Sequence, residues 1–242
     1  MNRRNVKLSG NKRVGLGNSI KTPNQLTQHL EKRHLKPAST QVKKIQKAFE
    51  GREQSYYVDI EFTHKFPCEI CVMNSKKVVL VNTTINYGCT IAELYDTDGF
   101  SWMDIASLSK IYGPPTNEIT PGLTPTEIMA VLKDHGMTQQ SLLVEWSSNK
   151  CDYNWVLWLA KQAGQVDIVP RFENTFSPLS AWRSCLPGFF SFRLSDLYSF
   201  LYPDELKSRL SEVHRALFDT VMLYDCTQVL YDHTYGVKDK KG

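Results

Sequence analysis

The run SYYVDIEF at residues 55–62 constrains the fold of this chain most, because two acidic residues interrupt a strongly strand-forming segment. Tyrosine, valine, isoleucine and phenylalanine favour β-strands. Asp59 and Glu61 stand two residues apart, so both carboxylates project from one face of the strand. On a buried strand they would repel each other and lose hydration, and the run contains no Lys or Arg to offset this.

This acidic pair has two interpretations. A divalent cation such as magnesium or manganese would compensate a buried pair of carboxylates, because hard cations prefer oxygen ligands. Alternatively, the run is an exposed edge strand in which polar and apolar residues alternate. Residues elsewhere in the chain are needed to decide between these interpretations.

The remainder of the chain alternates between strand and helix patterns. The stretch CEICVMNSKKVVLVNTTI predicts a β-hairpin that turns at Asn74, Ser75 and Lys76. The stretch GLTPTEIMAVLKDHG predicts a helix that Thr124 caps and Gly136 ends. Further expected elements are a short helix at 102–110, a buried strand in SLLVEW, a helix in NKCDYNWVLWLAKQAG, a short strand in VDIVP, a helix in SDLYSFLYP and a final helix. This order predicts an α/β domain with a mixed sheet, in which a hairpin meander precedes α–β–α–β–α.

The final predicted helix contains SEVHRALFDTVMLYDCTQVL, with His214 five residues ahead of Asp219. One interpretation is a helix N-terminus followed by an apolar stripe that packs into the core. The other is a general base beside a metal ligand, because histidine exchanges protons near neutral pH and carboxylates suit hard cations. Asp152, in the first turn of an earlier helix, is by itself an acid that favours the helix dipole.

Five residues taken in chain order resemble the active-site set of the DEDDh branch of the 3′–5′ exonucleases, within the ribonuclease H-like superfamily: Asp59, Glu61, Asp152, His214 and Asp219. The stretch VDIEF matches the family's Asp-x-Glu on the first strand, and HRALFD matches its His-x-Ala-x-x-Asp. The similarity spans residues 55–232. Family members commonly show His-Asn-x-x-Phe-Asp in the middle motif, where this chain reads SSNKCD, so the chain is similar to a divergent subgroup.

The resemblance implies a ribonuclease H-like mixed β-sheet flanked by helices, and a 3′–5′ exonuclease that releases nucleoside 5′-monophosphates from RNA or DNA. Two divalent cations, Mg or Mn, would be held by four carboxylates: Asp59, Glu61, Asp152 and Asp219. His214 would take the proton of the attacking water. Phe62 and Thr63 would contact a nucleic acid with a single-stranded 3′ end, and Phe62 would stack on its terminal base. A core position is the alternative for Phe62.

A second functional hypothesis is a catalytically weak exonuclease-like module that binds nucleic acid or protein. The presence of all five expected residues argues against a dead enzyme. An endonuclease of the ribonuclease H type is disfavoured, because HRALFD does not mark that class.

A basic N-terminal extension at residues 1–54 divides the charge of the chain unequally. It holds 13 Lys and Arg against three Glu, a net charge of +10, whereas the rest of the chain carries −6. A basic arm on an acidic domain is expected of a chain that meets polyanions, and a solvated tail or a targeting signal are the alternatives. The arm is expected to be loop or disorder with a short helix from Thr22 to about Leu35. An exonuclease-like domain would follow at 55–235, and a polar tail at 236–242.

The six cysteines are scattered through apolar segments, which favours reduced intracellular thiols over a disulfide scaffold. We expect a protein of the nucleus or cytoplasm, with the mitochondrion as an alternative because the N-terminal segment is basic. Cys68 and Cys71 form a CxxC with His64 nearby, but a second ligand pair for zinc is missing, so buried thiols are the preferred interpretation. No stretch approaches the roughly 18 apolar residues of a membrane span, and no membrane partner is expected.

Overall fold

A computed structural model describes residues 39–50, 54–186, 189 and 191–235, and it contains a mixed sheet of five strands. The strands are β1 (Ser55–Phe62), β2 (Pro67–Asn74), β3 (Val79–Thr84), β4 (Leu142–Val144) and β5 (Thr175–Phe176), in the order β3-β2-β1-β4-β5. The β1–β2 and β2–β3 pairs are antiparallel, whereas β1–β4 and β4–β5 are parallel. The predicted α/β fold, with a hairpin meander at the start of a mixed sheet, is confirmed.

The central strand of this sheet is β1, which pairs with β2 on one side and β4 on the other. The interpretation of this run as an edge strand is therefore wrong. Asp59 lies opposite Cys71 and Glu61 lies opposite Glu69 in the β1–β2 register. The pairing with β4 covers only residues 55–57, so the acidic half of β1 has no strand neighbour on that side.

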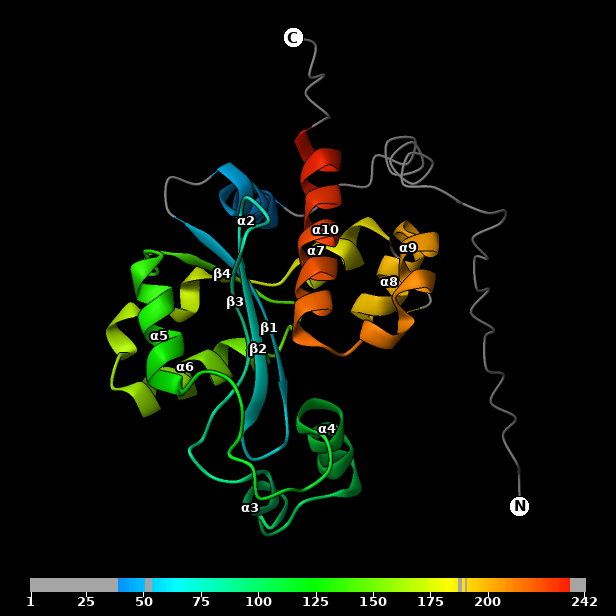
Figure 1. Ribbon diagram of the computed structural model, residues 1–242. Coiled ribbons are helices and arrows are strands. Elements are labelled where there is room, and N and C mark those ends of the chain that lie inside the picture. The colour runs from blue at the N-terminus through cyan, green and yellow to red at the C-terminus, as the bar shows by residue number, and fades with distance from the viewer. Residues whose placement is uncertain (1–38, 51–53, 187–188, 190, 236–242) are drawn as a thin grey trace, which may run out of the picture.

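Helices cover both faces of the sheet (Figure 1). One face carries α5 (Pro125–Asp134) and α6 (Cys151–Ala163). The other face carries five helices: α2 (Ser39–Glu50), α7 (Pro178–Cys185), α8 (Leu194–Leu201), α9 (Pro203–Ser208) and α10 (Ala216–Tyr235). Because side chains alternate along a strand, Tyr56, Val58 and Ile60 enter the α5–α6 core, whereas Tyr57 enters the α10 core. Asp59 and Glu61 share the face of Tyr57.

The helix α2 lies inside the stretch assigned above to the N-terminal extension. Its Ile45 and Ala48 are fully buried in the core beside α10, and its Phe49 ring lies 5.0 Å from that of Tyr231. The packed part of the chain therefore includes residues 39–50. The helix expected from Thr22 to Leu35 and the polar tail at 236–242 lie outside the described residues.

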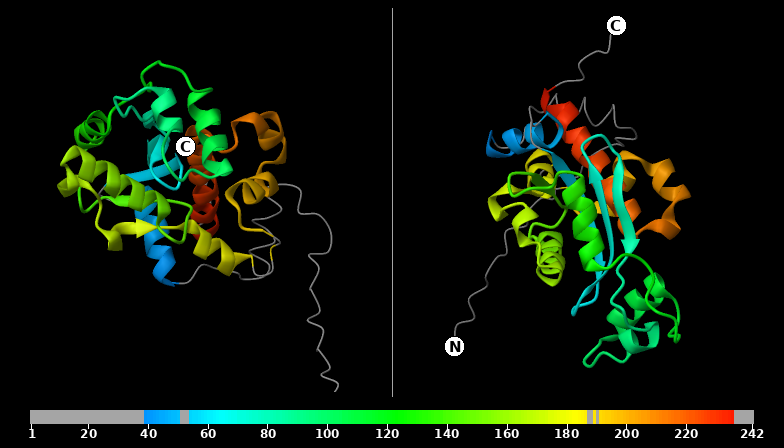
Figure 2. Two further views of the ribbon diagram at one scale, coloured as in Figure 1. Left: turned by 90° about the horizontal axis from the view of Figure 1, so that it is seen from below. Right: turned by 60° about the vertical axis from the view of Figure 1, so that its left-hand side comes forward.

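The segment between β3 and α5 forms a small helical layer beyond one end of the sheet (Figure 2). It contains α3 (Ile91–Tyr95) and α4 (Trp102–Tyr112), and each of these helices begins with a capping box. The helix expected at 102–110 is thus confirmed. The layer has its own small core, in which five residues are buried: Cys68, Ile91, Leu94, Leu108 and Tyr112.

The prediction of a strand in VDIVP is wrong, because Val166–Ile168 form a 3₁₀ turn and the fifth strand is Thr175–Phe176. Gly164 ends α6 in the left-handed conformation, and the 3₁₀ turn follows two residues later. Ile168 and Val169 are buried in the α5–α6 core. A short apolar run has the same pattern in a buried turn as in a strand, so periodicity could not separate the two. Within the described residues, no helix has both the length and the apolar character needed to cross a bilayer.

Candidate active site

The carboxyl ends of the parallel strands β1 and β4 and the N-termini of α6 and α10 meet at one end of the sheet (Figure 1). From β1 come Asp59 and Glu61, from the first turn of α6 comes Asp152, and from the first turn of α10 comes Asp219. His214 precedes α10 by two residues. Residues that are far apart in the sequence therefore reach one small region.

Glu61, His214 and Asp219 form the tightest group in this region. One potential ligand atom from each of the three side chains lies within 4.8 Å of the other two. His214 Nδ1 is 3.9 Å from Asp219 Oδ2, and the His214 backbone N–H donates to Asp219 Oδ1 at 3.2 Å. Two carboxylates and one imidazole at this spacing can hold a metal ion.

Asp152 reaches the same end of the sheet from the opposite face. Its Oδ1 accepts a hydrogen bond of 3.2 Å from the backbone N–H of Ile60, at the part of β1 that β4 leaves unpaired. The carboxylate therefore takes the place of a neighbouring strand beside Asp59 and Glu61.

The pKa values of the four carboxyl groups are raised. Withdrawal from water, followed by repulsion from Asp152, Asp219 and Glu61, raises the pKa of Asp59 well above its usual range. Burial raises the pKa of Asp152 to about 8, that of Glu61 to about 7 and that of Asp219 to about 6. A nearby cation stabilises the ionised form of buried carboxyl groups whose pKa values are raised in this way. The four oxygen donors therefore fit hard divalent ions.

Two buried glutamates that the sequence interpretation missed hold the helix starts in place. Glu145, directly after β4, is fully buried, and its Oε2 accepts from the backbone N–H groups of Asp152 at 3.1 Å and Tyr153 at 3.3 Å. Lys150 Nζ lies 3.7 Å from its other oxygen. Glu145 thus fixes the first turn of α6, and with it the backbone of Asp152.

Glu69 of β2 does the same for α10. Its carboxylate accepts hydrogen bonds from Arg215 Nε at 2.9 Å, from Arg215 Nη2 at 2.6 Å and from the Ala216 backbone N–H at 3.1 Å. In the sequence, Glu69 and Glu145 are lone acids at apolar strands, in CEICV and LLVEW. That pattern was the available signal for both residues.

His214 does not lie on the final helix, as the sequence suggested, but in the turn ahead of it. The helix begins at Ala216, and His214 has a left-handed backbone with φ of 61°. The reason is that Glu69 and Asp219 draw the backbone N–H groups of Ala216 and His214 toward them. Lys110 of α4 fixes the turn from outside, since its Nζ donates to the carbonyl oxygen of His214 at 2.9 Å.

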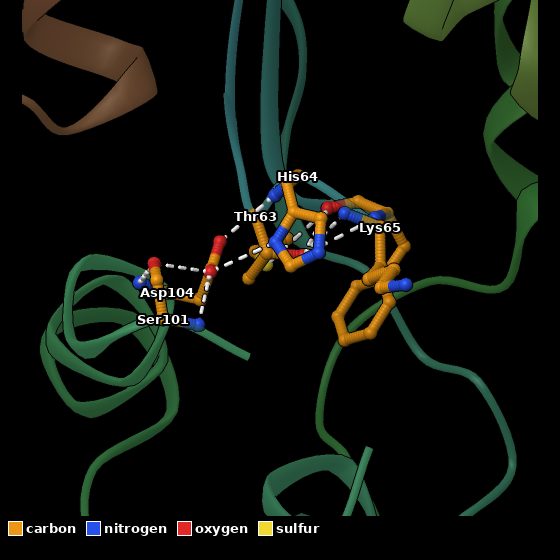
Figure 3. A network of polar contacts seen from close by, with 7 residues as sticks. Thr63, His64, Lys65, Ser101 and Asp104 are labelled. Carbon is orange, nitrogen blue, oxygen red and sulfur yellow. Dashed lines mark hydrogen bonds and ion pairs between the residues drawn. The ribbon is translucent and has the colours of Figure 1, made fainter. Parts of the chain in front are cut away.

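The helix α4 forms one wall of the site. Asp104, near its start, accepts from the backbone N–H of His64 at 2.9 Å and lies 2.8 Å from His64 Nδ1 (Figure 3). This contact ties α4 to the turn that follows β1. A cavity of about 310 Å³ lies between α4 and the site, and its lining residues are Glu61, Ala106, Ser107, Lys110, Ile111 and His214.

The two proposed substrate contacts differ in accessibility. Phe62 is 38% exposed, and its ring centroid lies 5.6 Å from that of Trp155 on α6. Thr63 is buried, and its hydroxyl accepts from the backbone N–H groups of Lys65 and Phe66, which closes the β1–β2 turn.

Cys68 and Cys71 are both buried in β2. Three residues apart on a strand, they point to opposite faces of the sheet, which does not suit a shared zinc ion.

Comparison with solved structures supports the fold. The chain is similar to Escherichia coli exonuclease I in its zinc-bound complex with single-stranded DNA, at 12% identity and a TM-score of 0.52, over 73% of this chain and 40% of that chain. A complex of the same enzyme with a dA16 oligonucleotide matches at 12% identity and a TM-score of 0.48, over 76% and 41%. No protein-family model and no curated protein sequence matches. The fold of this chain is thus similar to that of part of exonuclease I. The chain spans about two fifths of the length of the solved chains it matches.

Proposed function

We propose that this chain is a metal-dependent 3′–5′ exonuclease that hydrolyses phosphodiester bonds of RNA or DNA and releases nucleoside 5′-monophosphates. The observation that carries the proposal is the group of Glu61, His214 and Asp219, whose ligand atoms lie within 4.8 Å of one another. The fold adds support, because the compared exonuclease I was solved with single-stranded DNA. We extend that partner, a nucleic acid with a single-stranded 3′ end, to this chain as part of the proposal.

The proposed cofactors are two divalent cations, Mg or Mn, held by four residues: Asp59, Glu61, Asp152 and Asp219. All four carboxyl groups have raised pKa values, so their ionised forms need a cation close by. When bound, such ions stabilise the negative charge on the attacking and leaving oxygens of the phosphodiester.

The protein's own groups would handle the proton and the orientation of the substrate. His214, whose side chain is 74% exposed, would take the proton of the attacking water, and Asp219 would orient its imidazole and stabilise the charged form. The attack breaks the bond between phosphorus and the 3′-oxygen of the preceding nucleotide, so the terminal nucleotide leaves with its 5′-phosphate.

Phe62 would stack on the terminal base, since its exposed ring stands beside Trp155 close to the acidic end of β1. Thr63 would support this contact through the turn that it closes, because its hydroxyl already bonds to the backbone. The exonuclease-like domain, taken as residues 55–235 with α2 packed on it, would therefore hold the chemistry.

The test uses RNA and DNA oligomers carrying a label at either end, incubated with magnesium or manganese. A 5′ label should give a ladder that shortens with time, and a 3′ label should appear at once in a mononucleotide. Oligomers that are bound but remain intact with both metals would instead indicate the binding module.

A further inference from the structure

Helix α4 exposes apolar side chains to solvent. Trp102 is 78% exposed, Met103 is 60% exposed and Ile105 is 37% exposed. Only one face of the helix is buried, where Leu108 and Tyr112 enter the small core beyond the sheet. An exposed tryptophan beside an exposed methionine is unfavourable in water, and apolar groups gathered in this way commonly mark a binding surface.

Met103 continues the lining of the cavity at the candidate active site. Residues 103, 107 and 110 are spaced four and three apart, so they share one side of the helix. Ser107 and Lys110 line the cavity. Met103 therefore stands at the far end of the same row, roughly 10 Å along the helix axis from Lys110, and Trp102 borders it.

This row keeps a fixed position relative to the site, because α4 is attached at two points. Asp104 holds His64 in the turn after β1, and Lys110 holds the carbonyl oxygen of His214 (Figure 3 shows the first of these contacts). A preorganised surface loses little conformational freedom when it binds a ligand.

We propose that Trp102 and Met103 bind unpaired nucleobases of the substrate, upstream of the terminal nucleotide, and so select a single-stranded 3′ end. This inference rests on the proposed function, since it takes the strand to end at Glu61 and His214. We define this surface, formed by Trp102, Met103 and Ser107, as the α4 track.

Stacking chemistry favours this occupant. A base that is unpaired offers an open aromatic face to an indole ring or a thioether, and such contacts tolerate any sequence. In a duplex the faces are already covered by neighbouring pairs, so a duplex would gain nothing from Trp102. The track is also continuous with the cavity, so a strand that leaves the cavity along α4 must pass over it.

The experiment measures binding of fluorescein-labelled single strands of two and eight nucleotides to the full chain, in EDTA so that no hydrolysis occurs. The double variant Trp102→Ala with Met103→Ala should bind the octamer at least about ten-fold more weakly, whereas the dimer should bind with nearly unchanged affinity because it does not extend to Trp102 and Met103. The matched control is Ile105→Ala, which removes an exposed apolar side chain of the same helix outside the row. Trp102→Phe should keep most of the affinity, because it retains an aromatic face.

Two results would overturn the proposal: an octamer affinity equal to that of the unmodified chain, which would leave the track to a protein partner, or an equal loss in Ile105→Ala. If the unmodified chain hydrolyses nothing yet the octamer defect is observed, the proposed function fails and the α4 track stands. If the unmodified chain hydrolyses the oligomers but the double variant binds the octamer equally well, the proposed role of the α4 track is wrong and the proposed function stands.

Discussion

The ammonium group of Lys110 lies 2.9 Å from the carbonyl oxygen of His214, so helix α4 is joined directly to the turn that carries the proposed base. The same ammonium group lowers the pKa values of Glu61 and Asp219, although burial raises both overall. One side chain therefore influences both the position of the imidazole and the charge of two proposed metal ligands.

Lys110→Met should reduce turnover about 10- to 100-fold, the effect typical of losing a residue that orients metal ligands. Its loss also removes a positive charge, so the rise of activity with pH should move to higher pH. The measurement is the pH profile of hydrolysis, with Lys133→Met on α5 as the matched control. An unshifted profile would mean that Lys110 only stabilises the fold.

His214→Ala should lower turnover by on the order of 10²- to 10⁴-fold while substrate and metal binding stay nearly constant, since a base acts in the chemical step. Asp219→Asn should instead weaken metal binding. Calorimetric titration with Mn²⁺ beside single-turnover hydrolysis separates the two effects. A variant of His214 that loses metal binding but keeps turnover would contradict the assignment.

Asp59→Asn should abolish hydrolysis and also stabilise the metal-free protein, because it removes a desolvated carboxyl group whose ionised form four other carboxylates repel. A gain of about 1 kcal/mol in the free energy of unfolding is reasonable for relief of such strain at a functional site. Thermal unfolding with and without magnesium provides the measurement. Asp134→Asn, at the exposed end of α5, is the control and should change neither property.

The metal-free protein should become less stable as the pH rises from about 4.5 to about 7. In the folded protein burial raises the pKa of Glu61 from 4.5 to about 7, so between these values the folded state holds a proton that the unfolded chain has lost. Below this window Glu61 is protonated in both the folded and the unfolded state, so its raised pKa costs no stability. Above the window Glu61 is ionised in both states, and the full loss of stability is present. Each kcal/mol lost from the free energy of unfolding should lower the melting temperature by about 3 °C. Saturating magnesium should reduce this dependence of the melting temperature on pH. A melting temperature that rises through this window would contradict the raised pKa.

Deletion of residues 1–38 should weaken binding to single strands without reducing hydrolysis at saturating substrate. If four basic side chains of this segment contact phosphates, the slope of log binding constant against log salt concentration should become less steep by about 3 when the segment is deleted. Deletion of 1–54 should differ sharply, because it removes the buried Ile45 and Ala48 and should destabilise the fold. Equal salt slopes with and without residues 1–38 would exclude a role in binding.

The sequence predicted the part of the site that depends on local spacing. The i, i+2 pair of Asp59 and Glu61 placed both carboxylates on one face, and the structure places both on the face of Tyr57. What could not be predicted depends on contacts between distant segments. Glu69 and Glu145 accept hydrogen bonds from the starts of α10 and α6. His214 lies ahead of α10 because Glu69 and Asp219 bond to the backbone of that turn.

The same limit applies to the fold. The hairpin and the helix capped by Thr124 follow from residues close in sequence and were predicted, whereas the capped helix α3 was not. The packing of α2 was missed because the basic residues 43, 44 and 47 dominate its composition and obscure the apolar face formed by Ile45, Ala48 and Phe49. Burial of that face depends on α10, which follows more than 160 residues later.

The proposed ligands come from opposite sides of the sheet, since α6 brings Asp152 from one helical layer and α10 brings Asp219 from the other. Ions held between them would cross-link the two layers through the central strand. Amide hydrogens in α6 and α10 should then exchange more slowly together when metal is added, as a single cooperative unit, instead of opening independently. The metal would therefore stabilise the tertiary structure as well as take part in the reaction.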